Sequence, residues 1–185
     1  MTAKRVLVPL AEGFEEIEAV TIVDVLRRAG VEVVVAGLAD TRVVGSHGIA
    51  LDADTVFDGV DPASFDMIVL PGGMPGTLHL LQDERVLEAV RALHGAGRHT
   101  AAICAAPRVL AAAGVVSRVP VTSHPSVRGQ LGDADVRAEP RVIKSGKVLT
   151  SQGAGTAMEF ALELVAELCG RERADALAAA MVVPR

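Results

Sequence analysis

Cys104 stands where a short apolar run meets a run of helical character, in the stretch TAAICAAPRVLAAAG that spans Thr100 to Gly114. Pro107 suits the first turn of that helix, because its missing N–H would be unpaired there in any case. A side chain at such a strand-to-helix turn lies beside unpaired backbone N–H groups at the positive end of the helix, as in a nucleophile elbow. We expect a reactive thiol whose pKa lies below the ordinary value of roughly 8.5. A buried, inert cysteine is the alternative.

Glu18 is the acidic side chain best placed to act on that thiol. It lies on the apolar face of a helix that follows the first strand-like run, whereas Glu15 and Glu16 suit the exposed first turn, where negative charge is favourable. Burial against the sheet edge would raise the pKa of the Glu18 carboxyl above about 4.3, so that it is protonated and donates a hydrogen bond to sulfur. Simple helix capping is the alternative role for this carboxylate.

His124 is the histidine expected near Cys104, as an acid or a base. It follows a strand-like run and precedes Pro125, which holds it in an extended conformation. The remaining histidines lie in polar or turn-like stretches and are expected at the surface: His47, His79, His94 and His99. Cys169 ends an amphipathic helix before Gly170, and we expect it to serve packing.

Two glycine-rich stretches follow predicted strands. In LPGGMPG, the amides of Gly72 and Gly73 are unobstructed by side chains and could form part of an oxyanion pocket beside Cys104, although a tight turn is the alternative. No Lys and Ser/Thr follow in P-loop spacing, which argues against nucleoside triphosphate binding. QGAGTAMEF is followed by too little chain for a dinucleotide-binding unit and is interpreted as a helix start.

Composition limits the classes of function. The 185 residues fit one domain spanning 1–185, and the net charge of −5 with no Trp or Tyr argues against a nucleic-acid surface. No apolar run reaches the ~20 residues of a membrane span, and the first residues do not resemble a signal peptide, so we expect a cytoplasmic protein. Two cysteines make no disulfide framework. No cofactor or metal is expected, since no ligand grouping has metal-site spacing.

The elements that must position these residues alternate between short β-rich runs and longer helical patterns. The pattern predicts strands at 5–10, 31–37, 66–73, 99–103 and 119–125, hairpins at 43–54 and 142–151, and helices at 14–30, 77–96, 105–113, 155–170 and 171–180. This alternation favours a three-layer αβα sandwich of flavodoxin-like α/β class with a mostly parallel sheet. Because functional groups gather at the carboxyl ends of parallel strands, Glu18, Gly73, Cys104 and His124 should share one edge.

Five segments together resemble the DJ-1/ThiJ/PfpI superfamily, and specifically its DJ-1-like branch: LAEGFEEIEAV, VLPGGMPG, AAICAAP, TSHP and LTSQGAGTAMEFAL. They occur in order over nearly the whole chain, without large insertions. The resemblance implies a flavodoxin-like sandwich, a homodimer, and a site in which Glu18 is the protonated acid touching Cys104. It also implies that His124 lies alongside and that the backbone amides of Gly73 and Ala105 border the pocket.

The same resemblance implies a cysteine-dependent, cofactor-free glyoxalase III or protein deglycase, an enzyme of hydrolase or lyase type. Its substrates would be small α-oxoaldehydes such as methylglyoxal and glyoxal, or their adducts. A redox-responsive stress protein or chaperone with an oxidation-sensitive Cys104 is the alternative. A cysteine peptidase or amidase is less favoured, because Ala105 stands where PfpI-type peptidases have a histidine after the nucleophile.

Overall fold

A seven-stranded sheet forms the centre of the computed structural model, which describes residues 3–184. The strands lie in the order β10–β11–β7–β6–β1–β2–β5, and only the β10–β11 pair is antiparallel. Their bounds in chain order are β1 Arg5–Leu10, β2 Glu32–Gly37, β5 Thr55–Val56, β6 Met67–Leu70, β7 His99–Ile103, β10 Val142–Ser145 and β11 Val148–Ser151.

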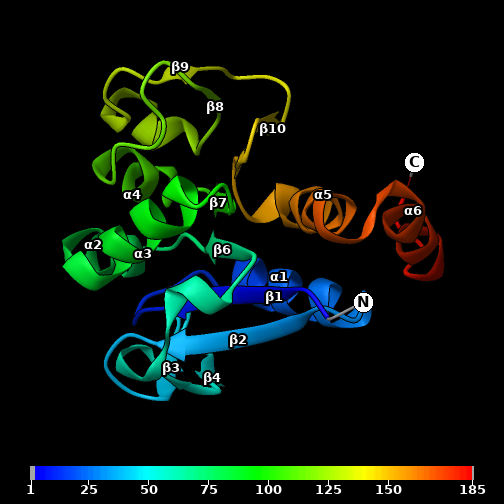
Figure 1. Ribbon diagram of the computed structural model, residues 1–185, viewed down its shortest axis with the longest axis horizontal. Helices are drawn as coiled ribbons and strands as arrows, with labels where there is room; N and C mark the ends of the chain where they lie inside the picture. Colours follow the sequence, from blue (N-terminus) through cyan, green and yellow to red (C-terminus); the bar gives the residue numbers. More distant parts are fainter. Residues whose placement is uncertain (1–2, 185) are drawn as a thin grey trace.

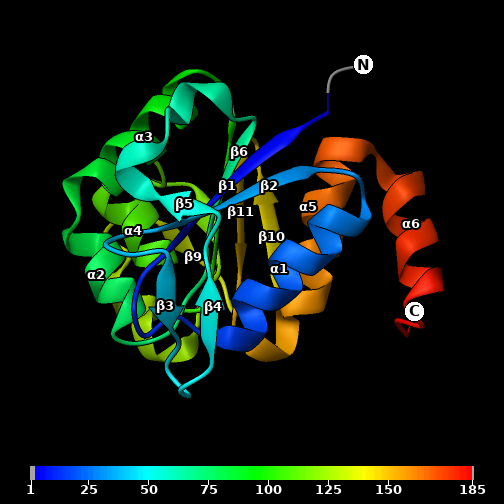
Figure 2. The same cartoon turned by 90° about the horizontal axis from the view of Figure 1, so that it is seen from below.

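Helices cover both faces of this sheet, which confirms the predicted αβα sandwich (Figure 2). One face carries α1 Glu16–Arg28, α5 Ala157–Cys169 and α6 Arg171–Ala180, while the other carries α2 Gly76–Gln82, α3 Glu84–Gly95 and α4 Pro107–Ala112. Successive residues of β1 alternate between the two layers of core: Val6 and Val8 pack toward α1 and α5, and Leu7 packs toward the other layer. Strands buried on both faces therefore read as continuous apolar runs.

A two-stranded hairpin, β3 Arg42–Val44 and β4 Ala50–Asp52, lies beside the main sheet, as the sequence predicts (Figure 1). Its turn holds Gly48 at a φ of +83°, in the left-handed region that glycine tolerates best. The hairpin is tied to the loop before α1, because the N–H of Gly13 donates to the carbonyl of Val44 at 2.8 Å and the N–H of Ser46 donates to the carbonyl of Phe14 at 2.8 Å.

Two predicted elements differ from the structure. The helix expected over 77–96 is broken at Asp83, whose extended backbone ends α2 and whose carboxylate accepts the N–H of Arg85 to cap α3. The fifth strand is reduced to β8 Pro120–Val121, which pairs with β9 Asp135–Val136 in a separate small sheet. The main-sheet position beside β7 belongs instead to β11, which offers a longer run of paired backbone.

Three side chains lie in surroundings opposite to those expected. Glu16, expected in an exposed first helical turn, is buried with 5% of its area exposed. Cys169, predicted to serve packing, is exposed at the end of α5. His99, predicted at the surface, is buried with 8% of its area exposed, because it begins β7 inside the sheet. Among residues 3–184, no helix combines the length and apolar character needed to cross a bilayer.

Candidate active site

Cys104 immediately follows β7 and has a φ of 62°, a left-handed conformation that is rare for a non-glycine residue. Such a conformation costs about 1–2 kcal/mol and persists only where neighbours fix it. Here the N–H of Cys104 donates to the carbonyl of Ser151 at 3.0 Å, and its own carbonyl accepts the N–H of His124 at 2.8 Å. The sharp turn therefore has the predicted elbow geometry, clamped from β11 and from the loop after β8.

Glu18 is fully buried in the first turn of α1. Its Oε2 accepts the N–H of Gly72 at 2.8 Å, and its backbone N–H donates to the Glu15 side chain at 2.7 Å, so Glu15 is the residue that caps the helix. Burial raises the pKa of the Glu18 carboxyl to about 7, although hydrogen bonds from Gly72 and Cys104 act in the opposite direction. The predicted direction of this pKa shift is confirmed.

The thiol of Cys104 does not show the predicted shift. Burial and the negative charge of Glu18 raise its pKa to about 12, while hydrogen bonds from the backbone N–H groups of Ala105 and Gly73 only partly offset them. The expectation of a lowered pKa is therefore wrong, because it counted the helix start and not the desolvation of a half-buried sulfur beside a carboxyl group. In addition, α4 has only six residues, so its macrodipole is weak and lowers the thiol pKa little.

Glu18 and Cys104 form a coupled pair of acids. The Glu18 Oε1 atom is buried and has no partner of ordinary hydrogen-bond geometry, which leaves it available to carry a proton toward the sulfur. The pair loses its first proton, from Glu18, near neutral pH. Loss of the second proton, from the Cys104 thiol, is unfavourable because it would place two negative charges side by side where few water molecules solvate them. The arrangement suits transfer of one proton between carboxylate and sulfur.

The glycines after β6 allow this close contact. A Cβ on Gly72 would lie 2.6 Å from the Cys104 Cβ and 2.8 Å from the Glu18 Oε2, and Gly73 has a φ of +96°. Gly72 was expected to help form an oxyanion pocket, but its N–H is already donated to Glu18. The amides of Gly73 and Ala105 act instead to lower the pKa of the Cys104 thiol, and their place at the border of a substrate pocket stays a prediction.

His124 lies next to Cys104 through its backbone. Its side chain is exposed, and its Nδ1 lies 2.8 Å from the hydroxyl of Ser126. A Cβ on Gly153 would lie 3.6 Å from the imidazole Cδ2, so the ring borders the loop after β11. An acid or base role for His124 stays a prediction.

A second cluster, which sequence spacing does not reveal, joins α1 to the hairpin. Glu16 is buried and accepts the N–H of His47 at 2.6 Å, and its Oε2 lies 2.8 Å from the imidazole Nδ1 of His47. These bonds lower the pKa of Glu16 to about 2 despite burial, and they raise the pKa of His47. Within residues 3–184, Glu15, Glu16 and His47 are close enough to hold a metal ion, with candidate ligand atoms within 4.8 Å of one another. Because the backbone N–H and the imidazole of His47 already bind the Glu16 carboxylate, we interpret the cluster as a structural link between α1 and the hairpin. We call this link, formed by Glu16 and His47, the latch.

The fold and the site define a class: an αβα sandwich with a cysteine elbow, in which the sulfur contacts a buried carboxyl group from the first helix. The chain belongs to the DJ-1/PfpI family, whose model matches residues 4–167. Protein dj-1beta of Drosophila melanogaster is 41% identical over 183 residues, which cover 98% of either chain. Its crystal structure matches with a TM-score of 0.96 over 100% of both chains.

Two other relatives bear on function. A Caenorhabditis elegans protein named glutathione-independent glyoxalase DJR-1.2 is 36% identical over 167 residues, which cover 90% of this chain and 89% of that protein. The structure of oxidized Toxoplasma gondii DJ-1 is 38% identical with a TM-score of 0.94, over 99% of this chain and 100% of that one. The family therefore includes a protein named as a glyoxalase and one whose structure is of an oxidized form.

Proposed function

We propose that this protein is a cofactor-independent glyoxalase that converts small α-oxoaldehydes, such as methylglyoxal and glyoxal, into hydroxy acids, and that it also acts on their adducts as a deglycase. The closeness of the fully buried Glu18 carboxyl group to the elbow side chain of Cys104, both within 2.8 Å of the place a Cβ on Gly72 would take, is the observation that carries the proposal. The C. elegans relative with glyoxalase in its name supports the same chemistry.

The first step is nucleophilic attack by sulfur. Because the thiol pKa is about 12 and the Glu18 pKa about 7, the thiol is protonated at neutral pH and about half of the molecules carry a Glu18 carboxylate beside it. The carboxylate accepts the Sγ proton as sulfur adds to the aldehyde carbon, which forms a hemithioacetal. The developing oxygen charge then accepts hydrogen bonds from the amides of Gly73 and Ala105.

Glu18 next moves protons between substrate atoms. It first gives the proton taken from sulfur to the substrate oxyanion, which completes the hemithioacetal and restores the carboxylate. The carboxylate then removes the proton from the former aldehyde carbon and delivers it to the neighbouring carbon, while the hydroxyl proton moves to the neighbouring oxygen, so that the hemithioacetal becomes a thioester of the hydroxy acid. Water hydrolyses the thioester, which releases the acid and restores the thiol. Atoms and electrons balance as methylglyoxal plus water giving lactate, so no external oxidant or reductant takes part.

Lactate release from methylglyoxal by the purified protein tests the proposal. We expect Cys104→Ser to lose at least about 100-fold in kcat, since it removes the nucleophile that splits the reaction into two steps. The matched control is Cys169→Ser, which removes the exposed cysteine and should keep wild-type turnover. Equal turnover by wild type and Cys104→Ser would refute the proposal.

A redox-responsive role, as a stress protein or chaperone, is the second candidate, favoured by the donors around sulfur. The amides of Gly73 and Ala105 and a protonated Glu18 would stabilise a sulfinate at Cys104. Mass spectrometry of protein treated with peroxide should then show oxidation of half-buried Cys104 before exposed Cys169. The opposite order, which exposure alone would produce, would exclude this role.

Peptide or amide hydrolysis has less support, since the His124 Nδ1 lies against Ser126.

We further propose that the protein is a homodimer through α1 and the hairpin. Apolar side chains are exposed there: 57% of Ile17, 45% of Val20 and 57% of Ile49. Arg28, on the same helix, pairs with Asp24 at 2.8 Å and is thereby held within its own chain. Light scattering should give twice the monomer mass for wild type and the monomer mass for Ile17→Asp. Val182→Asp is the control, since that side chain is 86% exposed elsewhere. A monomeric wild type would exclude the dimer.

A further inference from the structure

Lys147 differs from the other two lysines of the chain in its hydrogen-bond partner. Lys4 pairs with Asp66 at 3.2 Å, and Lys144 pairs with Glu167. The Lys147 Nζ lies 3.1 Å from the Nε2 of His99 instead, and no carboxylate of residues 3–184 lies within ion-pair distance of it. All three lysines are exposed, with 48% of the Lys4 side chain and 46% of the Lys144 side chain accessible to solvent.

His99 is held as a hydrogen-bond acceptor. It is buried at the start of β7, where the Lys147 carbonyl accepts the N–H of the next residue, Thr100, at 2.9 Å. Burial lowers the pKa of His99, and the charges of Lys147, Lys144 and Lys4 add to this effect, against Glu167. A neutral ring whose Nε2 accepts from an ammonium group must carry its proton on Nδ1, and that atom is buried without a partner.

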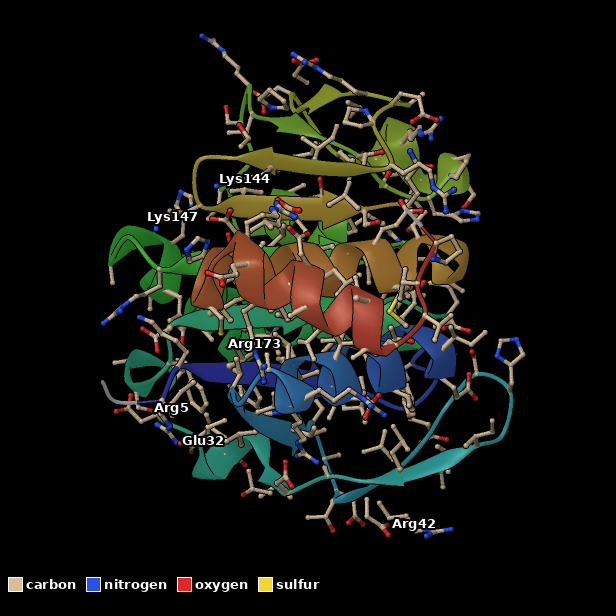
Figure 3. The ribbon with its side chains drawn as sticks, turned by 90° about the vertical axis from the view of Figure 1, so that its right-hand side faces the viewer. Arg5, Glu32, Arg42, Lys144, Lys147 and Arg173 are labelled. Carbon is tan, nitrogen blue, oxygen red and sulfur yellow. The ribbon has the colours of Figure 1, made fainter. Side chains whose placement is uncertain are left out.

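The pair lies at the amino ends of the strands, opposite the cysteine. Lys147 precedes β11 and His99 begins β7, whereas Cys104 follows the carboxyl end of β7. Figure 3 shows Lys147 and Lys144 at the same end of the molecule as Arg5, the first residue of β1. Any chemistry at this place is therefore separate from the site at Cys104.

We propose that Lys147 is a site of N-acylation by small acyl phosphates, with His99 as the proton acceptor. An ammonium group must lose a proton before nitrogen can attack a carbonyl carbon. A carboxylate partner stabilises the ammonium form by charge, as in Lys4 and Lys144, whereas a neutral imidazole adds no opposite charge and its Nε2 can accept the departing proton. The positive charges of Lys147 and Lys144 also attract an anionic donor to this end of the sheet.

The reaction balances without a further reactant. The His99 Nε2 takes one proton from the Lys147 ammonium group, and the freed amine attacks the acyl carbon. A C–N bond forms, and the C–O bond to phosphate breaks with its electron pair going to phosphate. The second proton lost from nitrogen goes to phosphate, and His99 returns its proton to water. The products are an amide on Lys147, hydrogen phosphate and one proton.

Acetylation of the full-length protein by acetyl phosphate tests this proposal, with rates at the three lysines followed by peptide mass spectrometry. We expect acetylation of Lys147 to be about ten-fold faster than that of Lys4 or Lys144, a modest value for a positioned base. The variant His99→Phe keeps a buried ring without the acceptor and should bring Lys147 to the rate of the other two. His94→Phe, which alters a half-buried histidine of α3, is the control and should leave all rates unchanged.

A pH series on the wild-type protein gives a second readout that needs no variant at His99. The ratio of the Lys147 rate to the Lys4 rate should fall at acidic pH, below the range in which an ordinary histidine titrates, as His99 becomes protonated, since imidazolium accepts no proton. Equal rates at the three lysines, a Lys147 advantage that survives in folded His99→Phe, or a ratio independent of pH would each overturn the proposal.

Discussion

Cys104 and Glu18 have pKa values that suit transfer of a proton from the thiol to the carboxylate. A buried carboxyl group with a pKa near 7 is an effective base at neutral pH, and a thiol with a pKa near 12 requires one. In the proposed reaction the thiol is therefore activated at the moment of attack, by proton transfer to Glu18, and need not exist as a stable thiolate. The raised thiol pKa is compatible with catalysis on this basis, and it argues against rapid oxidation of the free protein.

The variant Glu18→Gln tests this proton transfer. In the wild type we expect turnover of methylglyoxal to rise with pH through about 7, because the carboxylate form of Glu18 is the active one. Glu18→Gln should lose about 100-fold in kcat, the lower end of what a positioned base contributes, and its rate should show no inflection near pH 7. Steady-state kinetics from pH 5 to 9 measure both. An inflection that persists in the variant would assign the titration to another group.

Only a glycine fits at position 72, because the side chains of Glu18 and Cys104 fill the space that a Cβ would occupy. A methyl group at this position would lie 2.6 Å from the Cys104 Cβ, so Gly72→Ala must displace one of the two side chains. We expect a loss of about 1–3 kcal/mol in the free energy of unfolding, as for other overpacked sites, together with reduced turnover. Urea unfolding measures the first. The control Gly95→Ala has open space around its new Cβ and should not be destabilised.

Sequence reasoning predicted that Cys104 and Glu18 lie close together, which the structure shows, but it did not predict their electrostatics. The strand-to-helix position of Cys104 and the helical position of Glu18 are local properties, and both can be recognised from residue types and spacing. The raised thiol pKa and the use of the Gly72 amide by Glu18 depend on atoms that meet from different strands. No spacing within the chain encodes those distances.

Long elements were predicted well and short ones poorly. Strand β7 is buried over its whole length, and helix α5 places its buried apolar residues on one face, so their patterns identify them without tertiary information. Strand β8 is two residues long, and its partner β9 could not be foreseen. The division between α2 and α3 depends on one residue, Asp83, whose role as a cap is visible in the sequence only once the helix is known to restart there.

The latch between α1 and the hairpin should make a measurable contribution to stability. Glu16→Gln replaces a charged acceptor of the His47 N–H and imidazole, and we expect a loss of about 2 kcal/mol in the free energy of unfolding at pH 7. Because the pKa of Glu16 is lowered to about 2, the stabilisation is full above pH 4.5 and disappears as the pH falls through 2. Urea unfolding at pH 7 and at pH 2 measures it.

The variant His47→Ala separates the two kinds of bond in this latch. It keeps the backbone N–H of residue 47 and removes the imidazole, so it should lose less stability than Glu16→Gln. Hydrogen exchange at the amide of residue 47 should accelerate in Glu16→Gln, because that amide loses its charged acceptor. Unchanged stability and exchange in Glu16→Gln would show that other bonds, such as the one from Ser46 to Phe14, hold the hairpin alone.

The free energy of unfolding of the whole molecule should depend on pH because Glu18 is a buried acid with a raised pKa. The folded protein holds a proton on Glu18 up to about pH 7, whereas the unfolded chain releases it near 4.5. The folded state therefore binds more protons between these values, and this contribution to stability is full below pH 4.5 and is lost as the pH rises through 7. The opposite shift of Glu16 acts below pH 4.5, so the two effects occupy separate windows.

Comparison of wild type with Glu18→Gln isolates this effect, because other titrating groups such as His99 and His47 are common to both proteins. From pH 4.5 to 8, we expect the variant to gain about 3 kcal/mol in unfolding free energy relative to wild type, from the shift in the Glu18 pKa. Urea unfolding at intervals across this range measures the difference, and pH 8 lies below the thiol titration. A difference that does not vary with pH would mean that Glu18 titrates as an ordinary exposed acid, and the proposed proton transfer to it from Cys104 would then lose its basis.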